Sequence, residues 1–85
     1  MATPAVHIKV LLFARFAELL GNSELDLVLD PPATVRTALD SLRALPGGAS
    51  LPSGPLVARN LVQAQLDTAL EDGDEVAVLP PLAGG

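Results

Sequence analysis

Residues 72–85 read DGDEVAVLPPLAGG, and this stretch predicts a turn, a strand, a stop and a slender tail. The pair Asp72-Gly73 is typical of a turn, because glycine tolerates a positive φ and aspartate can bond its own backbone. The unbroken apolar run Val76–Leu79 favours a strand that is covered on both faces. The pair Pro80-Pro81 then ends the strand, since proline has no N–H to donate to a neighbouring strand.

The tail Leu82-Ala83-Gly84-Gly85 carries little side-chain bulk. Its two glycines have no β-carbon, so they can enter a channel that is too narrow for a side chain. Four extended residues span roughly 13 Å, which is enough to carry the end of the chain into a partner's active site. A frayed terminus has the same composition, and the residues alone leave that alternative open. The strand and the pair Pro80-Pro81 favour an aimed tail, because they set the direction in which it leaves.

The composition excludes several functional classes. The chain has 85 residues, 49% of them hydrophobic and 2% aromatic, which predicts one small domain over 1–85 with a core of Leu, Val and Ala. A net charge of −5 with scattered basic residues argues against nucleic-acid binding. Cysteine is absent, which excludes disulfides and thiolate metal sites and makes a cytoplasmic location the expectation. No apolar run approaches the length of a membrane span, so we expect no membrane insertion.

The first strand is predicted from alternation over 6–13. One of its faces is apolar throughout. The other face begins polar and turns apolar at Leu11 and Phe13, so an apolar spot is expected at that end. Such a spot is either residual core or a docking patch, and at Phe13 the two interpretations are evenly balanced.

The remaining pattern completes the fold prediction. It indicates a short helix over 14–20 stopped by Gly21, a strand over 24–29, an amphipathic helix that Thr34 can cap, a surface loop over 46–55, a strand over 56–60 and a short return through 62–66. A right-handed crossover through the main helix places the final strand beside the first and parallel to it. The expected fold is therefore α+β, a ubiquitin-like β-grasp with a mixed sheet of four to five strands and one main helix on one face.

No self-contained active site is predicted. The acidic residues over 67–75 lack the spacing of a calcium loop and are interpreted as a solvated turn. His7 is the only histidine, and no pattern gives it a serine or second histidine as a partner, so we expect neither a catalytic triad nor a zinc site. The group with distinctive chemistry is the terminal carboxylate of Gly85. Once converted to an acyl adenylate it can accept sulfur and become a thiocarboxylate, which needs no side-chain chemistry.

Four segments of the chain resemble a known family. They are IKVLLFA at 8–14, ELLG at 18–21, LEDGDEV at 70–76 and PPLAGG at 80–85. Together they are similar to the small subunits of molybdopterin synthase, the MoaD-like sulfur carriers, from about Val6 to Gly85. The resemblance implies that an E1-like adenylyltransferase uses ATP to adenylate Gly85 and that a sulfur donor enzyme supplies the sulfur. It implies no permanently bound cofactor and no metal.

The same resemblance implies a partner. The tail would enter the large catalytic subunit of molybdopterin synthase, within a heterotetramer, and give its sulfur to cyclic pyranopterin monophosphate. Gly84 and Gly85 would carry the reaction, and the implied partner-binding residues are Phe13, Leu79, Pro80, Pro81, Leu82 and Ala83. Three positions depart from the family pattern: Ala17, where an arginine is frequent, Arg59, where an apolar residue is usual, and Gln63, where an apolar docking residue often stands.

Three other functions stay open at this point. A carrier for another thiocarboxylate pathway, such as thiamin thiazole synthesis, also ends in Gly-Gly, although the pair Pro80-Pro81 favours the molybdopterin branch. A protein modifier would form isopeptide bonds through the same end. A passive ubiquitin-like binding module would not need Gly85 at all.

Overall fold

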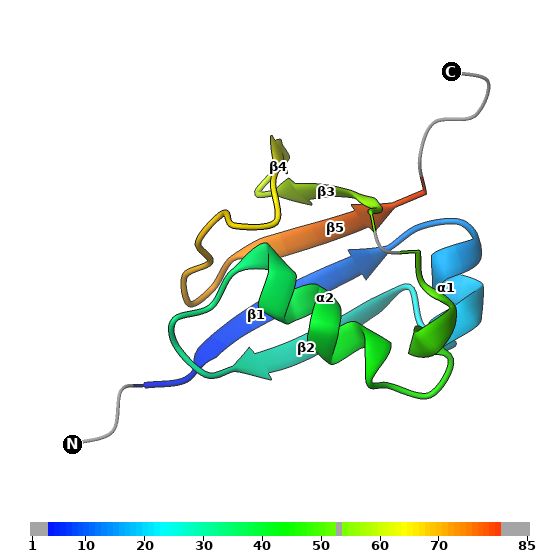
Figure 1. Cartoon of the computed structure of the whole chain (residues 1–85), viewed down its shortest axis with the longest axis horizontal. Helices are drawn as coiled ribbons and strands as arrows, with labels where there is room; N and C mark the ends of the chain where they lie inside the picture. Colours follow the sequence, from blue (N-terminus) through cyan, green and yellow to red (C-terminus); the bar gives the residue numbers. More distant parts are fainter. Residues whose placement is uncertain (1–3, 53, 81–85) are drawn as a thin grey trace.

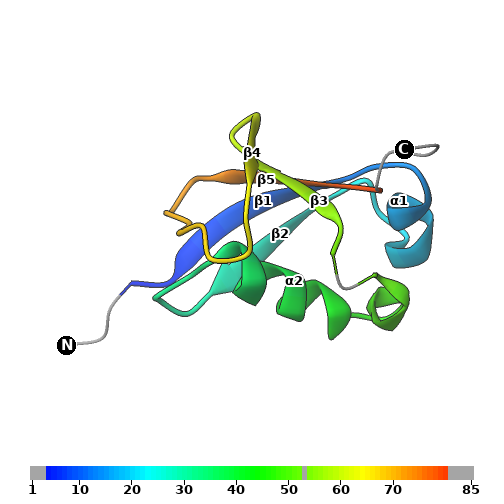
Figure 2. The same ribbon diagram turned by 45° about the horizontal axis from the view of Figure 1, so that its top comes forward.

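The computed structural model describes residues 4–52 and 54–80. In this part of the chain the elements are β1 (Val6–Leu12), α1 (Arg15–Leu20), β2 (Glu24–Leu29), α2 (Val35–Arg43), the 3-10 helix η1 (Gly48–Ser50), β3 (Leu56–Arg59), β4 (Val62–Ala64) and β5 (Glu75–Leu79). The strands form one sheet in the order β2-β1-β5-β3-β4, and α2 lies across one of its faces (Figures 1 and 2). No helix within these ranges is long or apolar enough to cross a membrane.

The centre of the sheet is formed by the first and last strands. β1 pairs parallel with β5 and antiparallel with β2, and β3 pairs antiparallel with both β5 and β4. Parallel neighbours cannot be joined by a tight turn, and here the connection from β1 to β5 passes through α2. A five-stranded mixed sheet with one main helix on one face is the β-grasp, so the predicted fold class and strand arrangement are confirmed.

The helix ends follow the predicted local signals. Thr34 caps α2, because its Oγ1 accepts from the backbone N–H of Thr37 at 3.3 Å while its own N–H donates to Thr37 Oγ1 at 2.9 Å. This reciprocal pair satisfies two N–H groups that the first turn of a helix leaves without partners. α1 ends at Gly21, whose φ of 75° is a left-handed value that favours glycine.

The core lies between the sheet and α2, and one expectation about it is wrong. The largest fully buried side chains are Phe16, Leu39, Leu42, Val10, Val35, Val76 and Val78. We expected β5 to be covered on both faces. Val76 and Val78 are fully buried, but Ala77 and Leu79 are only half-buried. The physical reason is that α2 covers one face of the sheet, and no second layer of the described chain covers the other (Figure 2).

The predicted surface loop over 46–55 packs against the helices. Gly48 and Leu51 are buried, and Arg43 Nη2 donates to the carbonyl oxygen of Pro52 at 2.7 Å. Gly47 has a φ of 85°, and a β-carbon there would overlap the carbonyl oxygen of Leu19 in α1. The loop sequence therefore allows a close backbone approach between η1 and α1 that a larger residue would prevent.

Candidate docking face and the root of the tail

The uncovered face of the sheet carries an apolar patch at one end. Register places Leu11 beside Ala77 and Ala77 beside Ala58, and it places Leu79 beside Leu56. Phe13 follows directly, with its N–H donating to the carbonyl oxygen of Val78 at 3.4 Å. We call this set the apolar patch: Leu11, Phe13, Leu56, Ala58, Ala77 and Leu79. These residues alternate with the buried ones along their strands, so they face away from α2.

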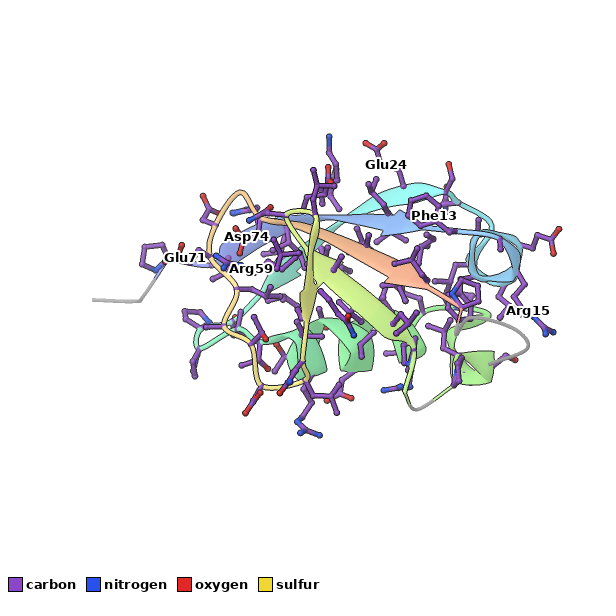
Figure 3. The ribbon with its side chains drawn as sticks, turned by 90° about the horizontal axis from the view of Figure 1, so that it is seen from above. Phe13, Arg15, Glu24, Arg59, Glu71 and Asp74 are labelled. Atoms are coloured by element: carbon purple, nitrogen blue, oxygen red, sulfur yellow. The ribbon has the colours of Figure 1, made fainter. Side chains whose placement is uncertain are left out.

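Charged side chains and the exposed Val28 lie on the rest of the same face. Lys9 Nζ lies 3.4 Å from Glu24 Oε1, and the register sets Lys9 between Asp26 and Glu75. Phe13 and Glu24 lie on the same side of the sheet, away from α2 (Figure 3). Charged side chains therefore border the apolar patch, since Glu24 pairs with Leu11, and the patch defines an apolar end where β1 and β5 finish.

The predicted partner-binding residues meet at this apolar end as far as the structure describes them. Phe13 is 43% exposed, whereas Leu79 and Pro80 are half-buried. Pro81, Leu82, Ala83, Gly84 and Gly85 lie outside the described residues. Pro80, the last described residue, therefore lies at the same end of the sheet as Phe13, the most exposed member of the apolar patch.

The departures Ala17, Arg59 and Gln63 occupy three different environments. Arg59 pairs with the buried Val76, so it lies on the α2 side of the sheet. It is therefore absent from the uncovered face, which we call the docking face and which carries the apolar patch. Gln63 is exposed and pairs with Ala58, which places it on the docking face at the border of the apolar patch. Ala17 is half-buried in α1 and packs against the core.

Arg59 is part of a polar cluster that the sequence did not reveal. Its Nε donates to Asp74 Oδ2 at 2.6 Å, and Asp74 also accepts from Asn60 Nδ2 at 2.9 Å and from the backbone N–H of Glu71 at 2.8 Å. Asp74 is only 7% exposed. The interpretation of the acidic run over 67–75 as a solvated turn is therefore wrong at Asp74, because a carboxylate that accepts three hydrogen bonds can be buried.

The cluster changes the titration of its carboxylate. Burial opposes ionisation of Asp74, but the hydrogen bonds from Arg59, the Glu71 amide and Asn60 outweigh it and hold the pKa below its ordinary value. These groups lie at the end of the sheet opposite to Phe13 (Figure 3). The cluster therefore joins the β3–β4 turn to the loop before β5 and takes no part in the apolar patch.

His7 also has a partner that no pattern indicated. Its backbone N–H donates to Asp72 Oδ1 at 2.8 Å, and its Nδ1 lies 3.0 Å from the same oxygen. The backbone hydrogen bond, followed by that of the ring, lowers the pKa of the Asp72 carboxyl. Both groups are largely exposed, and this pair fastens the turn before β5 to the start of β1.

Comparison with known proteins identifies the family. Residues 10–85 match the ThiS family along most of the chain. The chain belongs to the ThiS family. The molybdopterin synthase sulfur carrier subunit of Arabidopsis thaliana is 36% identical, over 98% of this chain and 88% of that protein. The protein of the same name in Escherichia coli is 38% identical, over 92% of this chain and 99% of that protein.

A solved structure extends the comparison of this ThiS-family chain. The crystal structure of SAMP1 from Haloferax volcanii is 36% identical, covers 93% of this chain and 99% of that chain, and superposes with a TM-score of 0.80. The resemblance to MoaD-like carriers and the ubiquitin-like fold are both confirmed by these likenesses.

Proposed function

We propose that this ThiS-family protein is the sulfur carrier of molybdopterin synthase. The observation that carries the proposal is the likeness to two sulfur carrier subunits of that enzyme over nearly the full length of the chain. The chain is not an enzyme by itself in this proposal. It supplies the sulfur that the large catalytic subunit transfers to cyclic pyranopterin monophosphate.

The reacting group is the carboxylate of Gly85. An E1-like adenylyltransferase uses ATP to form the acyl adenylate, with release of pyrophosphate. Hydrosulfide supplied by a donor enzyme then attacks the acyl carbon and displaces AMP, and the product is a thiocarboxylate at Gly85. Gly84 keeps the end slender enough to enter the catalytic subunit. ATP acts as a substrate of the activating enzyme, and the carrier itself holds no cofactor.

In this scheme the folded domain binds the partner and carries the tail. Residues 1–85 act as one cytoplasmic carrier domain, and 82–85 form its arm. Phe13, Leu79 and Pro80 lie at the end of the docking face from which the tail departs, and Pro81, Leu82 and Ala83 continue it toward the reactive end. An apolar surface of this kind, with charges around it, suits binding to another protein. The complex with the large subunit is a heterotetramer, as the family resemblance implies.

Intact mass spectrometry tests the reaction. The protein is incubated with an E1-like adenylyltransferase of the molybdopterin pathway, ATP and sulfide. We expect a mass gain equal to the replacement of one oxygen by sulfur, located at Gly85 by fragmentation. A variant that lacks Gly85 is the matched control and should gain nothing. An unchanged mass, with an activating enzyme that works on its own carrier, would contradict the proposal.

Two other functions belong to the same fold and family. The likeness to SAMP1, a small archaeal modifier protein, favours a protein modifier as the second candidate. The ThiS family match leaves room for a carrier in another thiocarboxylate pathway, such as thiamin thiazole synthesis. Recovery of the chain joined to lysines of many proteins would support the modifier. Sulfur transfer to a thiazole synthase, with none to molybdopterin synthase, would support the other carrier.

A further inference from the structure

A pocket lies next to the root of the tail and outside the apolar patch. Its volume is about 530 Å³, and its lining residues are Arg15, Phe16, Leu19, Ser50, Pro52 and Pro80. They come from α1, from η1 with the residues after it, and from the residue that follows β5. The three elements lie together at one end of the molecule in both ribbon views (Figures 1 and 2). The volume falls within the range of pockets that bind ligands.

The walls of the pocket are held by specific contacts. Phe16 is 2% exposed and belongs to the core, so the floor of the pocket is fixed. Arg43 holds the carbonyl of Pro52, and Gly47 allows η1 to approach α1 closely. The pocket therefore exists before any partner arrives, which lowers the conformational entropy that binding would cost.

Arg15 gives the pocket a positive charge. Lys9, Arg43 and Arg59 each have a carboxylate within 4 Å, whereas Arg15 and Arg36 have none among residues 4–52 and 54–80. Of these two unpaired guanidinium groups, only Arg15 lines the pocket, where Phe16, Leu19 and the prolines are its apolar neighbours. An apolar floor with one cation at its side fits an apolar group next to a carboxylate.

The backbone at Ala14 connects the pocket to the apolar patch. Ala14 has a φ of 53° and a ψ of −130°, a combination that favours glycine, and it lies between Phe13 and Arg15. Holding an alanine in this backbone conformation costs free energy. Residues with strained backbone conformations concentrate at functional sites. The turn at Ala14 leaves Phe13 on the docking face and starts α1 with Arg15. Phe13 of the apolar patch and Arg15 of the pocket are therefore separated by a single residue.

We propose that this pocket is a second docking site for the subunit that receives the tail. It takes a segment of that subunit in which an acidic side chain, which pairs with Arg15, stands next to an apolar one, which contacts Phe16, Leu19 and Pro80. The inference rests on the proposed function, because it assumes that a partner encloses the tail. The chain's own tail is a poorer occupant, since a proline at position 81 restricts Pro80 to extended backbone, which opposes a reversal of the chain directly after the pocket.

Charge reversal with a matched control tests the ionic part of the site. Binding of Arg15→Glu to the large subunit of molybdopterin synthase from the same organism is measured by calorimetry at low and high salt. We expect the Kd to rise about tenfold at low salt and less at high salt. Arg36→Glu changes the net charge equally on the other unpaired cation, away from the pocket, and should change the Kd less than about twofold.

A steric variant tests the cavity itself. Ser50→Trp should fill the pocket and weaken binding at both salt concentrations, whereas Ala49→Trp, at an exposed neighbour that does not line the pocket, should bind as the parent protein does. Circular dichroism and thermal unfolding establish that each variant is folded. Rescue of Arg15→Glu by a lysine in place of one acidic residue of the partner would identify the pair.

The possible results separate the inference from the proposed function. Failure of the unaltered protein to bind the large subunit, or to form a thiocarboxylate, overturns both. Normal binding by Arg15→Glu and Ser50→Trp, with normal thiocarboxylate formation, overturns the pocket alone. Equal loss in Arg15→Glu and Arg36→Glu also overturns it, because the effect is then one of net charge. A change in the NMR signals of 81–85 in free Arg15→Glu would make the tail the occupant and overturn it as well.

Discussion

Arg59 Nε lies 2.6 Å from Asp74 Oδ2, and this contact joins two segments that are separated in the sequence. Asp74 precedes β5, and Arg59 ends β3. The carboxylate is almost completely buried, so the pair and its two additional donors determine where β5 begins. Because Glu75 begins β5 directly after Asp74, this polar contact fixes the start of the strand that ends at Leu79.

Replacing the buried carboxylate should destabilise the fold. Asp74→Asn removes the charge and turns one acceptor into a donor, which faces either Arg59 Nε together with the Glu71 N–H or the Asn60 Nδ2. We expect the free energy of unfolding to fall by about 2 kcal/mol, as measured with urea at pH 7. Asp67→Asn is the control at an exposed position and should change it by less than about 0.5 kcal/mol. Equal effects of the two substitutions would show that the cluster does not stabilise the protein.

Acid should destabilise the protein partly by protonating Asp74 of this cluster and Asp72, the partner of His7. The pKa values of Asp74 and Asp72 lie below the ordinary 3.8, so folding favours their ionised forms. Their contribution is present above that ordinary value and is lost as the pH falls below it toward the lowered pKa values. We expect the free energy of unfolding to fall between about pH 4 and pH 2, and to fall less steeply in Asp74→Asn. Parallel curves for the two proteins would contradict this.

Ala14→Gly should stabilise the protein. The φ of 53° and ψ of −130° are strained for alanine and accessible to glycine, and relief of the strain outweighs the extra freedom of the unfolded chain. We expect a gain of about 1 kcal/mol, equivalent to a Tm higher by about 5 °C. Ala17→Gly, inside α1, should instead cost about 1 kcal/mol. A lower Tm for Ala14→Gly would show that Ala14 carries no strain.

Truncation of Phe16 should mainly lower stability, whereas truncation of Phe13 should mainly weaken partner binding. Phe13 is 43% exposed and Phe16 is 2% exposed. Phe16→Ala should lower the free energy of unfolding by about 4 kcal/mol, because it leaves a cavity in the core. Phe13→Ala should lower it by only about 1 kcal/mol and should weaken binding to the large subunit at least about tenfold. Strong destabilisation with unchanged binding would make Phe13 a core residue.

Bulk near the end of the tail should stop sulfur transfer without unfolding the body. Gly84→Val adds a branched side chain where the proposed mechanism needs a slender arm. We expect sulfur transfer in a reconstituted synthase to be lost and the circular dichroism spectrum to be unchanged. Gly54→Val is the matched control, because a β-carbon there meets no atom within 4 Å, and it should transfer sulfur normally. Normal transfer by Gly84→Val would contradict the proposed role of the tail.

Local sequence patterns were sufficient to predict the main secondary-structure elements and their ends. The alternation over 6–13, the cap at Thr34 and the turn glycine at position 21 each depend on a few neighbouring residues, and the structure confirms all three. The exposed apolar spot at Phe13 followed from the same alternation. These features could be predicted because periodicity and capping operate over one or two turns of chain.

Features that depend on distant contacts could not be predicted in this way. Nothing near Arg59 indicated its pairing with Asp74, and nothing near His7 indicated Asp72. The loop over 46–55 had the composition of a surface loop, yet it packs between the helices through Gly48 and Leu51. In each case the partner is distant in the sequence, so only the folded chain brings the two groups within reach.

The sequence by itself determined the order of the elements, the face of each strand that enters the core, and the apolar final strand with its proline stop. The tertiary structure alone decided which carboxylate of the acidic run is buried, and that Phe13, Leu79, Pro80 and the Arg15 pocket share one end of the molecule. The physical reason is the parallel pairing of β1 with β5, which brings the ends of both strands together at one edge of the sheet. The periodicity of each helix and strand depends on neighbouring residues, whereas burial and charge pairing depend on that long-range contact.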